Sequence, residues 1–296
     1  MLKYSIELND NSVISAINEF LEEHEYICWA VEEDALTHSF SLCGYVASQE
    51  QGNEELSNIS NHIKINLTPT ITTIPDNDWT IAYRDSARPW QCENLYWIPL
   101  WMKDSINLPK DAVGIYIEPG MAFGTGSHET TQLCARSLVM FCNLYKKTED
   151  LVIKDCIDVG CGSGILGISA IKLGMSHATL LDIDPDAVRI AEENAKLNGI
   201  FPEQVDFVVG DLKTNLLGRQ ADLLLVNILS NVLLDNAELL VKSVRPGGML
   251  SLSGILTTER HIVHQAFEQQ IEKHWKSHIE TFGDIGEWTV LTYFRG

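Results

Sequence analysis

Two segments of the sequence are rich in glycine and are followed by residues that can form a helix. Residues 117–131 read IEPGMAFGTGSHETT, and residues 154–171 read KDCIDVGCGSGILGISAI. Glycine permits a sharp turn and the close approach of a ligand, because it has no Cβ. The first turn of a helix offers free backbone N–H groups to anionic atoms. We therefore expect a small ligand to bind at these loops.

The second segment fits two kinds of cofactor site. Gly162, Gly164 and Gly167 match the pattern GxGxxG, and Asp182 follows about twenty residues later, as a dinucleotide-binding fold requires. Asp158, however, lies two residues before the first glycine and gives D-x-G-x-G-x-G. A carboxylate at that position would repel a pyrophosphate, but it can pair with the amino group of a methionyl tail. This residue favours S-adenosylmethionine over NAD.

Three further residues extend the expected site to the nucleoside. Asp182 ends a predicted strand, where its carboxylate can accept hydrogen bonds from both ribose hydroxyls, and Ile183 beside it can cover one face of the adenine. Asp211, at the end of the next strand, can accept a hydrogen bond from the exocyclic amine of the adenine. Each carboxylate alone could instead cap a helix or lie in a solvated loop. As a set, these residues indicate a methyltransferase.

The first glycine-rich segment does not fit a phosphate-binding loop. It lacks the Gly-Lys-Ser/Thr sequence, and it precedes the first strand of the predicted sheet instead of following it. Ser127 has the residue type of an N-cap for the helix HETTQLCARSLVMFCNLY. That helix would direct its N-terminus at the carboxylate and sulfonium end of the cofactor. A tight turn followed by a capped helix, without a ligand, is the alternative.

A polar residue interrupts the apolar run LLLVNILSNVLL. Asn227 ends the fourth predicted strand, where a buried amide is costly unless it finds partners. In a methyltransferase, an asparagine at this position can accept a hydrogen bond from an attacking nitrogen. A plain turn at the end of the strand is the alternative.

The composition limits the possible partners. The formal net charge is −20 and no basic cluster is present, which argues against direct nucleic-acid binding. Residues 1–65 hold two lysines and twelve acidic residues, a net charge of −10. This acidity serves either as a solvated surface or as a docking face for a basic partner. We find no secretory or membrane-spanning segment, so the expected location is the cytoplasm.

Cysteine and histidine give no sign of a disulfide framework or a metal. The seven cysteines form no CxxC pair, which fits buried thiols in a reducing cytosol. Histidines 261, 264, 274 and 278 lie close together in the sequence, but no cysteine or carboxylate completes a familiar ligand spacing. We therefore expect no metal site.

The periodicity of apolar residues predicts two folded regions and a connector. Residues 1–65 follow the order β-α-β-β-α-β, typical of a small ferredoxin-like α+β domain; the strands are predicted at 3–8, 26–33, 38–46 and 62–67, and the helices at 12–24 and 54–59. Residues 66–110 have five prolines and four tryptophans, which indicate a connector that packs on another part of the chain.

The remaining residues alternate strands and helices. We expect strands near 153–158, 178–183, 205–209, 221–226 and 248–253, followed by two terminal strands in 274–282 and 287–295. Five such repeats indicate an α/β fold with an open, mainly parallel, Rossmann-like sheet that binds ligands beyond the carboxyl ends of its strands. The terminal pair reads as a hairpin, which adds an antiparallel strand.

Four segments resemble the bacterial ribosomal protein L11 methyltransferase family: EPGMAFGTGSHETT, DVGCGSGILGISAIKLG, LDIDPDAV and NILSNVL. The resemblance covers most of residues 111–296. It implies a cytoplasmic enzyme in which residues 1–65 recognise the basic ribosomal protein, residues 66–110 are a linker and residues 111–296 form a class I methyltransferase domain that uses S-adenosylmethionine.

The resemblance also implies the residues of the site. The family's cofactor contacts fall on Thr131, Gly160, Asp182 and Asn227, and Gly162 lies in the same loop. From the first motif, the residues that would line the pocket are Phe123, Gly124, Thr125 and His128. Asn227 is expected to orient the amine that is methylated, either a lysine ε-amine or an N-terminal α-amine. A related methyltransferase for a lysine of another protein, or for a small molecule, is the alternative. We expect a monomer.

Overall fold

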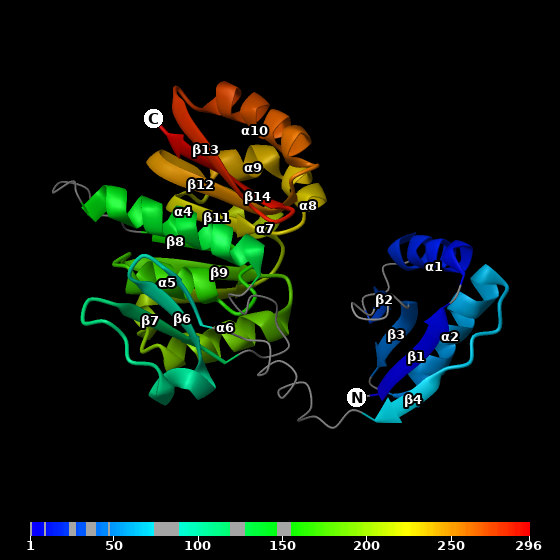
Figure 1. The fold of residues 1–296 in the computed structure, drawn as a ribbon. Helices are drawn as coiled ribbons and strands as arrows, with labels where there is room; N and C mark the ends of the chain where they lie inside the picture. Colours follow the sequence, from blue (N-terminus) through cyan, green and yellow to red (C-terminus); the bar gives the residue numbers. More distant parts are fainter. Residues whose placement is uncertain are drawn as a thin grey trace. The chain divides into compact units, whose positions relative to one another are not determined.

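The computed structural model describes residues 2–8, 10–23, 28–33, 40–46, 48–73, 89–118, 128–146 and 155–296. The chain folds into two compact units, Met1–Ser86 and Ala87–Gly296 (Figure 1). Each unit has its own hydrophobic core.

The N-terminal unit is an antiparallel sheet with two helices. Its elements in chain order are β1 (Leu2–Leu8), α1 (Asn11–Glu23), β2 (Trp29–Glu33), β3 (Phe40–Val46), α2 (Gln49–Ile63) and β4 (Thr70–Thr73). The strands lie in the order β2-β3-β1-β4, and every pairing is antiparallel. Alternate residues of β1, such as Tyr4 and Ile6, are buried against Ile17 and Ile59 of the helices. This is the ferredoxin-like arrangement that the element order predicts.

The strand predicted over residues 62–67 is wrong. Helix α2 continues to Ile63, and Lys64 ends it in a left-handed conformation, with its N–H donated to the carbonyl of Ser60. The alternation in HIKINL therefore belongs to the last turn of a helix and its cap. The fourth strand comes later, at Thr70–Thr73, and pairs with β1.

The C-terminal unit is built on a seven-stranded sheet. Its strands are β8 (Asp155–Val159), β9 (His177–Asp182), β10 (Val205–Val209), β11 (Ala221–Asn227), β12 (Val244–Leu256), β13 (His278–Ile285) and β14 (Trp288–Arg295). They lie in the order β10-β9-β8-β11-β12-β14-β13; β14 pairs antiparallel with both β12 and β13, and the other pairings are parallel. The structure confirms the mainly parallel sheet with an antiparallel terminal strand.

Helices cover both faces of this sheet. One face carries α4 (Glu129–Lys146), α5 (Ile165–Lys172) and α6 (Pro185–Leu197), and the other carries α7 (Leu212–Leu216), α8 (Ser230–Asp235), α9 (Ala237–Lys242) and α10 (Arg260–His274). Strand β11 supplies both cores, because its successive side chains point to opposite faces. Leu223 and Leu225 join the first core, and Leu224 and Val226 join the second.

A three-stranded sheet packs on the first group of helices. It consists of β5 (Trp90–Cys92), β6 (Leu95–Pro99) and β7 (Val113–Ile117), with a 3-10 helix, η1 (Leu100–Ser105), between β6 and β7. Trp97 is buried and donates a hydrogen bond of 2.9 Å from Nε1 to Oγ of Ser169 in α5. At the end of α6, the side-chain amide of Asn198 accepts from the N–H of Tyr116 and donates to its carbonyl. The described part of the aromatic segment from Trp90 onward packs on these helices and belongs to the C-terminal unit.

Candidate active site

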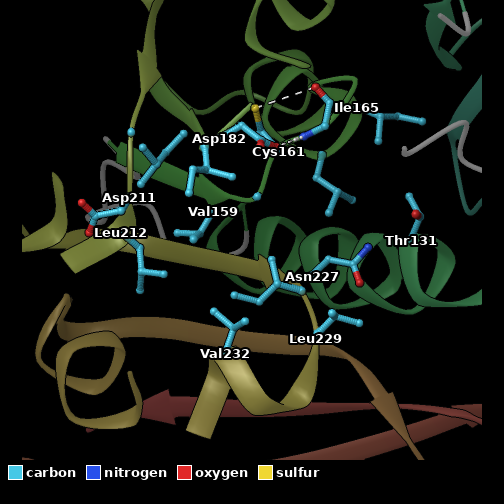
Figure 2. Close-up of a pocket in the computed structure, with 17 residues that line it drawn as sticks. Thr131, Val159, Cys161, Ile165, Asp182, Asp211, Leu212, Asn227, Leu229 and Val232 are labelled. Atoms are coloured by element: carbon cyan, nitrogen blue, oxygen red, sulfur yellow. Dashed lines mark hydrogen bonds between the residues drawn. The ribbon is translucent and has the colours of Figure 1, made fainter. Parts of the chain in front are cut away.

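A cavity of about 430 Å³ lies at the carboxyl ends of β8, β9, β10 and β11 (Figure 2). The polar and glycine residues that line it are Thr131, Gly160, Gly162, Asp182, Gly210, Asp211 and Asn227. Parallel α/β sheets bind their ligands at this edge. All of these residues except Gly210 were predicted to belong to the site. A seventh predicted residue, Ile183, also lines the cavity.

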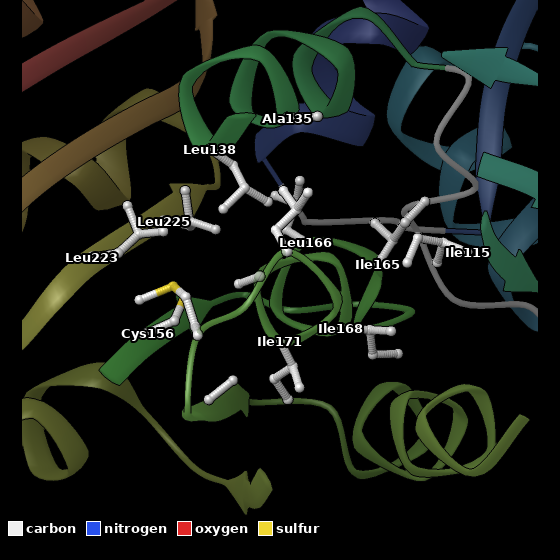
Figure 3. Packing of buried hydrophobic residues seen from close by; sticks show 14 of the residues in the cluster. Ile115, Ala135, Leu138, Cys156, Ile165, Leu166, Ile168, Ile171, Leu223 and Leu225 are labelled. Atoms are coloured by element: carbon white, nitrogen blue, oxygen red, sulfur yellow. The ribbon is translucent and has the colours of Figure 1, made fainter. Parts of the chain in front are cut away.

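The loop after β8 can approach a ligand closely because of its glycines. Gly160 and Gly162 have φ values of 67° and 51°, a region that other residues rarely adopt. A side chain at Gly160 would collide with Cγ2 of Ile228. Beneath the loop, Ile165 and Leu166 of α5 belong to the buried cluster drawn in Figure 3. The backbone of the loop thus rests on a packed core and is open on its ligand side.

Asp182 and Ile183 lie together at the end of β9. The carboxylate of Asp182 accepts hydrogen bonds from the N–H of Gly162, at 2.9 Å, and from the N–H of Asp184, at 3.0 Å. Each carboxylate oxygen has a second lone pair, so Asp182 can still accept from a hydroxyl group. Ile183 is 75% exposed and lines the same cavity, an unusual position for a large apolar side chain. The pair fits a ribose and an adjoining aromatic base.

Asp211 both lines the cavity and caps a helix. Its carboxylate accepts from the N–H of Thr214 at 3.0 Å and from the hydroxyl of Thr214 at 2.8 Å, at the start of α7. These hydrogen bonds hold the pKa of Asp211 below its ordinary value. The helix cap, which was the alternative interpretation, is therefore present, and the carboxylate is ionised beside the cavity.

Two neutral polar side chains of the cavity have unused hydrogen-bonding capacity. Thr131 in α4 is only 2% exposed, and its hydroxyl has no hydrogen-bond partner in the described part of the chain. The amide of Asn227, at the end of β11, likewise makes no side-chain hydrogen bond to the described residues. Figure 2 shows both groups on the same side of the cavity. The buried hydroxyl of Thr131 needs a partner, and the half-buried amide of Asn227 can take one, so these groups fit a ligand with polar ends.

The position of Asp158 corrects the expectation that its carboxylate faces the ligand. Asp158 is 1% exposed, does not line the cavity, and accepts a hydrogen bond of 2.8 Å from the N–H of Gly167 in α5. Burial, and then the negative charge of Asp182, raise the pKa of Asp158 to about 7. This carboxyl group ties the glycine loop to the helix beneath it.

His128 is also absent from the described residues that line the cavity. Its Nδ1 accepts from the N–H of Thr130 at 3.3 Å, so the imidazole caps α4, and its ring contacts Trp288 with centroids 5.2 Å apart. Ser127, the predicted cap, lies outside the described residues, together with Phe123, Gly124 and Thr125.

The remaining side of the cavity is apolar. The sequence analysis assigned no role to the residues that form this side, among them Leu212, Leu229 and Val232.

The reversed strand β14 and a nucleoside-sized cavity at the carboxyl edge of the sheet define a class I methyltransferase. Enzymes of this class take their methyl group from S-adenosylmethionine. The sequence profile described as Ribosomal protein L11 methyltransferase (PrmA) matches residues 5–295. The chain therefore belongs to the ribosomal protein L11 methyltransferase family.

Individual relatives agree with this assignment. The ribosomal protein L11 methyltransferase of Photorhabdus laumondii subsp. laumondii is 39% identical over 199 residues, which are 67% of this chain and 62% of that protein. The protein of the same name from Glaesserella parasuis serovar 5 is 37% identical over 241 residues, which are 79% and 75% of the two chains. The match to the Photorhabdus protein thus spans less than two thirds of its length.

A solved structure supports the fold. The crystal structure of ribosomal protein L11 methylase from Lactobacillus delbrueckii subsp. bulgaricus superposes with a TM-score of 0.55 at 29% identity, over 69% of this chain and 95% of that one. The comparisons confirm the predicted family, fold class, enzyme class and cofactor. In the part of the chain that the structure describes, no helix is long and apolar enough to cross a membrane.

Proposed function

We propose that the protein transfers methyl groups from S-adenosylmethionine to lysine ε-amino groups, N-terminal α-amino groups, or both, of ribosomal protein L11. The relatives named above are named as methyltransferases of ribosomal protein L11. The observation that carries the proposal is the amide of Asn227, which lines a cavity of about 430 Å³ and has no side-chain hydrogen bond to the described residues. A neutral hydrogen-bonding group of this kind suits the orientation of an amine.

Different residues of the cavity would bind different parts of the cofactor. Asp182 would hold the ribose hydroxyls, Ile183 would cover the adenine, and Asp211 would accept from its amine. The hydroxyl of Thr131 and the backbone of Gly160 and Gly162 would hold the amino-acid end. When bound, S-adenosylmethionine supplies an electrophilic methyl group on a positively charged sulfur.

The amine must lose a proton before it can attack, because a free lysine has a pKa of about 10.4. Leu229 and Val232 line the cavity with apolar surface, which removes water from the amine and lowers its pKa. Asn227 cannot take up the proton. Its carbonyl oxygen would accept a hydrogen bond from the amine and direct the nitrogen lone pair at the methyl group. Asn227 would thus lower the barrier by orienting the amine and not by removing its proton.

The N-terminal unit would dock the substrate. Residues 1–65 carry a net charge of −10, and Glu50 and Glu54 are exposed on α2. An acidic surface would attract a basic ribosomal protein and raise the rate of encounter. In this proposal the N-terminal unit recognises the substrate and the C-terminal unit carries out the reaction, in a cytoplasmic monomer.

The direct test is to incubate the full-length protein with purified ribosomal protein L11 and S-adenosylmethionine. Mass spectrometry should find whole methyl groups added to L11, on amines alone, and none when the cofactor is omitted. Labelled-methyl transfer into whole-cell lysate separates the alternatives by the size of the product. Labelling of a different protein, with L11 unmodified, would show that the substrate assignment is wrong.

A further inference from the structure

A second group of titratable side chains lies away from the cavity, between α10 and the terminal hairpin of β13 and β14. His264 and Glu268 are one helical turn apart on α10, and His278 and Glu280 are two residues apart on β13. Each pair therefore projects from one side of its element. Nε2 of His264 lies 2.7 Å from Oε2 of Glu280, and Nε2 of His278 lies 3.1 Å from Oε1 of Glu268.

The spacing of these atoms suits a metal ion. One ligand atom each from His264, Glu268 and Glu280 lies within 4.8 Å of the others. Zinc binds imidazole nitrogen and carboxylate oxygen at about 2.0–2.2 Å in a tetrahedron, which separates the ligand atoms by about 3.3 Å. The His264 and Glu280 atoms, 2.7 Å apart, lie closer than that value, and all three ligand atoms lie within 4.8 Å of one another, so rotations of the side chains would close the site.

Buried polar atoms beside the group lack partners. Oε1 of Glu268 is buried, and its contact with His278 does not have hydrogen-bond geometry. Tyr293 is fully buried, lies directly opposite Glu280 in the hairpin, and has no hydrogen-bond partner for its hydroxyl among the described residues. Opposite residues of neighbouring strands share a face of the sheet. The ring centroid of Tyr293 lies 6.3 Å from that of His264 and 6.2 Å from that of His278.

Two ion pairs without a metal account for this arrangement less well. Direct contacts of the imidazoles with Glu280 and Glu268 leave the hydroxyl of Tyr293 without a partner among the described residues. In metal sites, the ligating carboxylates accept hydrogen bonds from a second layer of groups, a role that this hydroxyl could fill.

We propose that His264, Glu268 and Glu280 bind one divalent transition-metal ion, for which zinc is the best match. Zinc accepts imidazole nitrogen and carboxylate oxygen as ligands, and three protein ligands leave a fourth position for water. The ion would join α10 to β13 at the edge of the sheet, far along the strand order from β8 and β9. It would stabilise this edge and take no part in methyl transfer.

The test uses the full-length protein without an affinity tag, stripped of metal by a chelator. Calorimetric titration with zinc should give one ion per chain, retained through gel filtration, and binding should raise the melting temperature. Cobalt in its place should give the visible absorption of a tetrahedral site. Glu268→Gln should weaken zinc binding by more than about tenfold.

His261→Gln is the matched control, because His261 is exposed on the same helix and does not belong to the group. It should bind zinc as the unmodified protein does. Circular dichroism and S-adenosylhomocysteine binding establish that each variant is folded. Substoichiometric zinc in the unmodified protein, or equal affinities for Glu268→Gln and His261→Gln, would overturn the proposal.

Discussion

At the scale of single residues, the cavity separates charged groups from neutral ones. The carboxylates of Asp182 and Asp211 already accept hydrogen bonds from protein donors, whereas the hydroxyl of Thr131 and the side-chain amide of Asn227 have no such partner among the described residues. The groups with most capacity left for ligands are therefore neutral. Such a site can hold an amine in place, but it offers no strong base.

Asn227→Ala should lower the turnover number by about 100-fold, which corresponds to about 2.7 kcal/mol of barrier. The loss arises because the amine is no longer oriented, so the dissociation constant of S-adenosylhomocysteine should change much less. Mass-spectrometric rates and calorimetry measure the two quantities. Asn231→Ala, at an exposed position on α8, is the control. Full turnover in Asn227→Ala would show that the orienting role is wrong.

Asp182→Ala should have the opposite pattern. It removes the acceptor for the ribose and the acceptor for the N–H of Gly162, so S-adenosylhomocysteine should bind about 10 to 100 times more weakly, the cost of about two lost hydrogen bonds. Asp186→Ala, at an exposed site in the first turn of α6, should leave affinity unchanged. An unaltered dissociation constant for Asp182→Ala would remove Asp182 from the cofactor site.

Asp158 should make the stability of the free protein depend on pH. Its pKa of about 7 in the folded state exceeds the value of about 3.9 in an unfolded chain. Between these values the folded protein holds a proton that the unfolded chain has lost. The free energy of unfolding should therefore fall as pH rises from about 4 to about 7, by up to about 1.4 kcal/mol per pH unit.

Asp158→Asn keeps an acceptor for the N–H of Gly167 and cannot ionise, so it should remove this contribution to the slope. Urea denaturation of both proteins at several pH values between about 4 and 8 gives the comparison. Identical slopes for the two proteins would mean that Asp158 titrates near its ordinary pKa.

At the scale of elements, apolar patterns predict the central sheet well. Strands β8 to β11 are short, mainly apolar runs. Gly160 and Gly210 follow β8 and β10, and Asp182 and Asn227 end β9 and β11, so the residues at the ligand edge follow from the strands themselves. The strand predicted at 62–67 was wrong because the end of a helix and its cap can alternate like a strand. The three-stranded sheet over residues 90–117 was not predicted, because its prolines and tryptophans carry no clear periodicity.

Side-chain direction was harder to predict than position. Asp158 lies one residue before the end of β8, and the pleat of the strand turns its carboxyl group under the loop instead of toward the cavity. The group of His264, Glu268 and Glu280 could not be found from ligand spacing either, because α10 must pack against β13 before the two pairs meet. Local sequence patterns predict helices and strands, but they do not show which of these elements will contact one another.

The glycine at the start of the loop gives a prediction at this scale. Gly160→Ala and Gly199→Ala both place a side chain at a left-handed φ, of 67° and 69°, which costs about 1–2 kcal/mol. A side chain at Gly199 meets open space, whereas one at Gly160 meets Ile228. Gly160→Ala should therefore destabilise the protein by about 1–3 kcal/mol more, and it should also weaken cofactor binding. Equal unfolding free energies in urea would contradict this.

At the scale of the whole molecule, the negative charge is concentrated in the N-terminal part of the chain. Residues 1–65 hold half of the net charge of −20, and the described residues that line the cavity all belong to the C-terminal unit. Recognition of the substrate protein and binding of the cofactor should therefore be separable.

Removal of residues 1–86, the N-terminal unit, tests this separation. The shortened protein should bind S-adenosylhomocysteine with unchanged affinity in calorimetry, because every described residue of the cavity remains. Its methylation of intact ribosomal protein L11 should fall below detection. Undiminished methylation by the shortened protein would refute the docking role of the N-terminal unit.

The central claim is that the cavity at the carboxyl edge of the seven-stranded sheet holds the methyl donor. A crystal structure with S-adenosylhomocysteine tests it most directly. We predict the ribose against the carboxylate of Asp182, the adenine beside Ile183, and the amino-acid end near the hydroxyl of Thr131. Density for the ligand elsewhere on the protein, with this cavity free of it, would contradict the account.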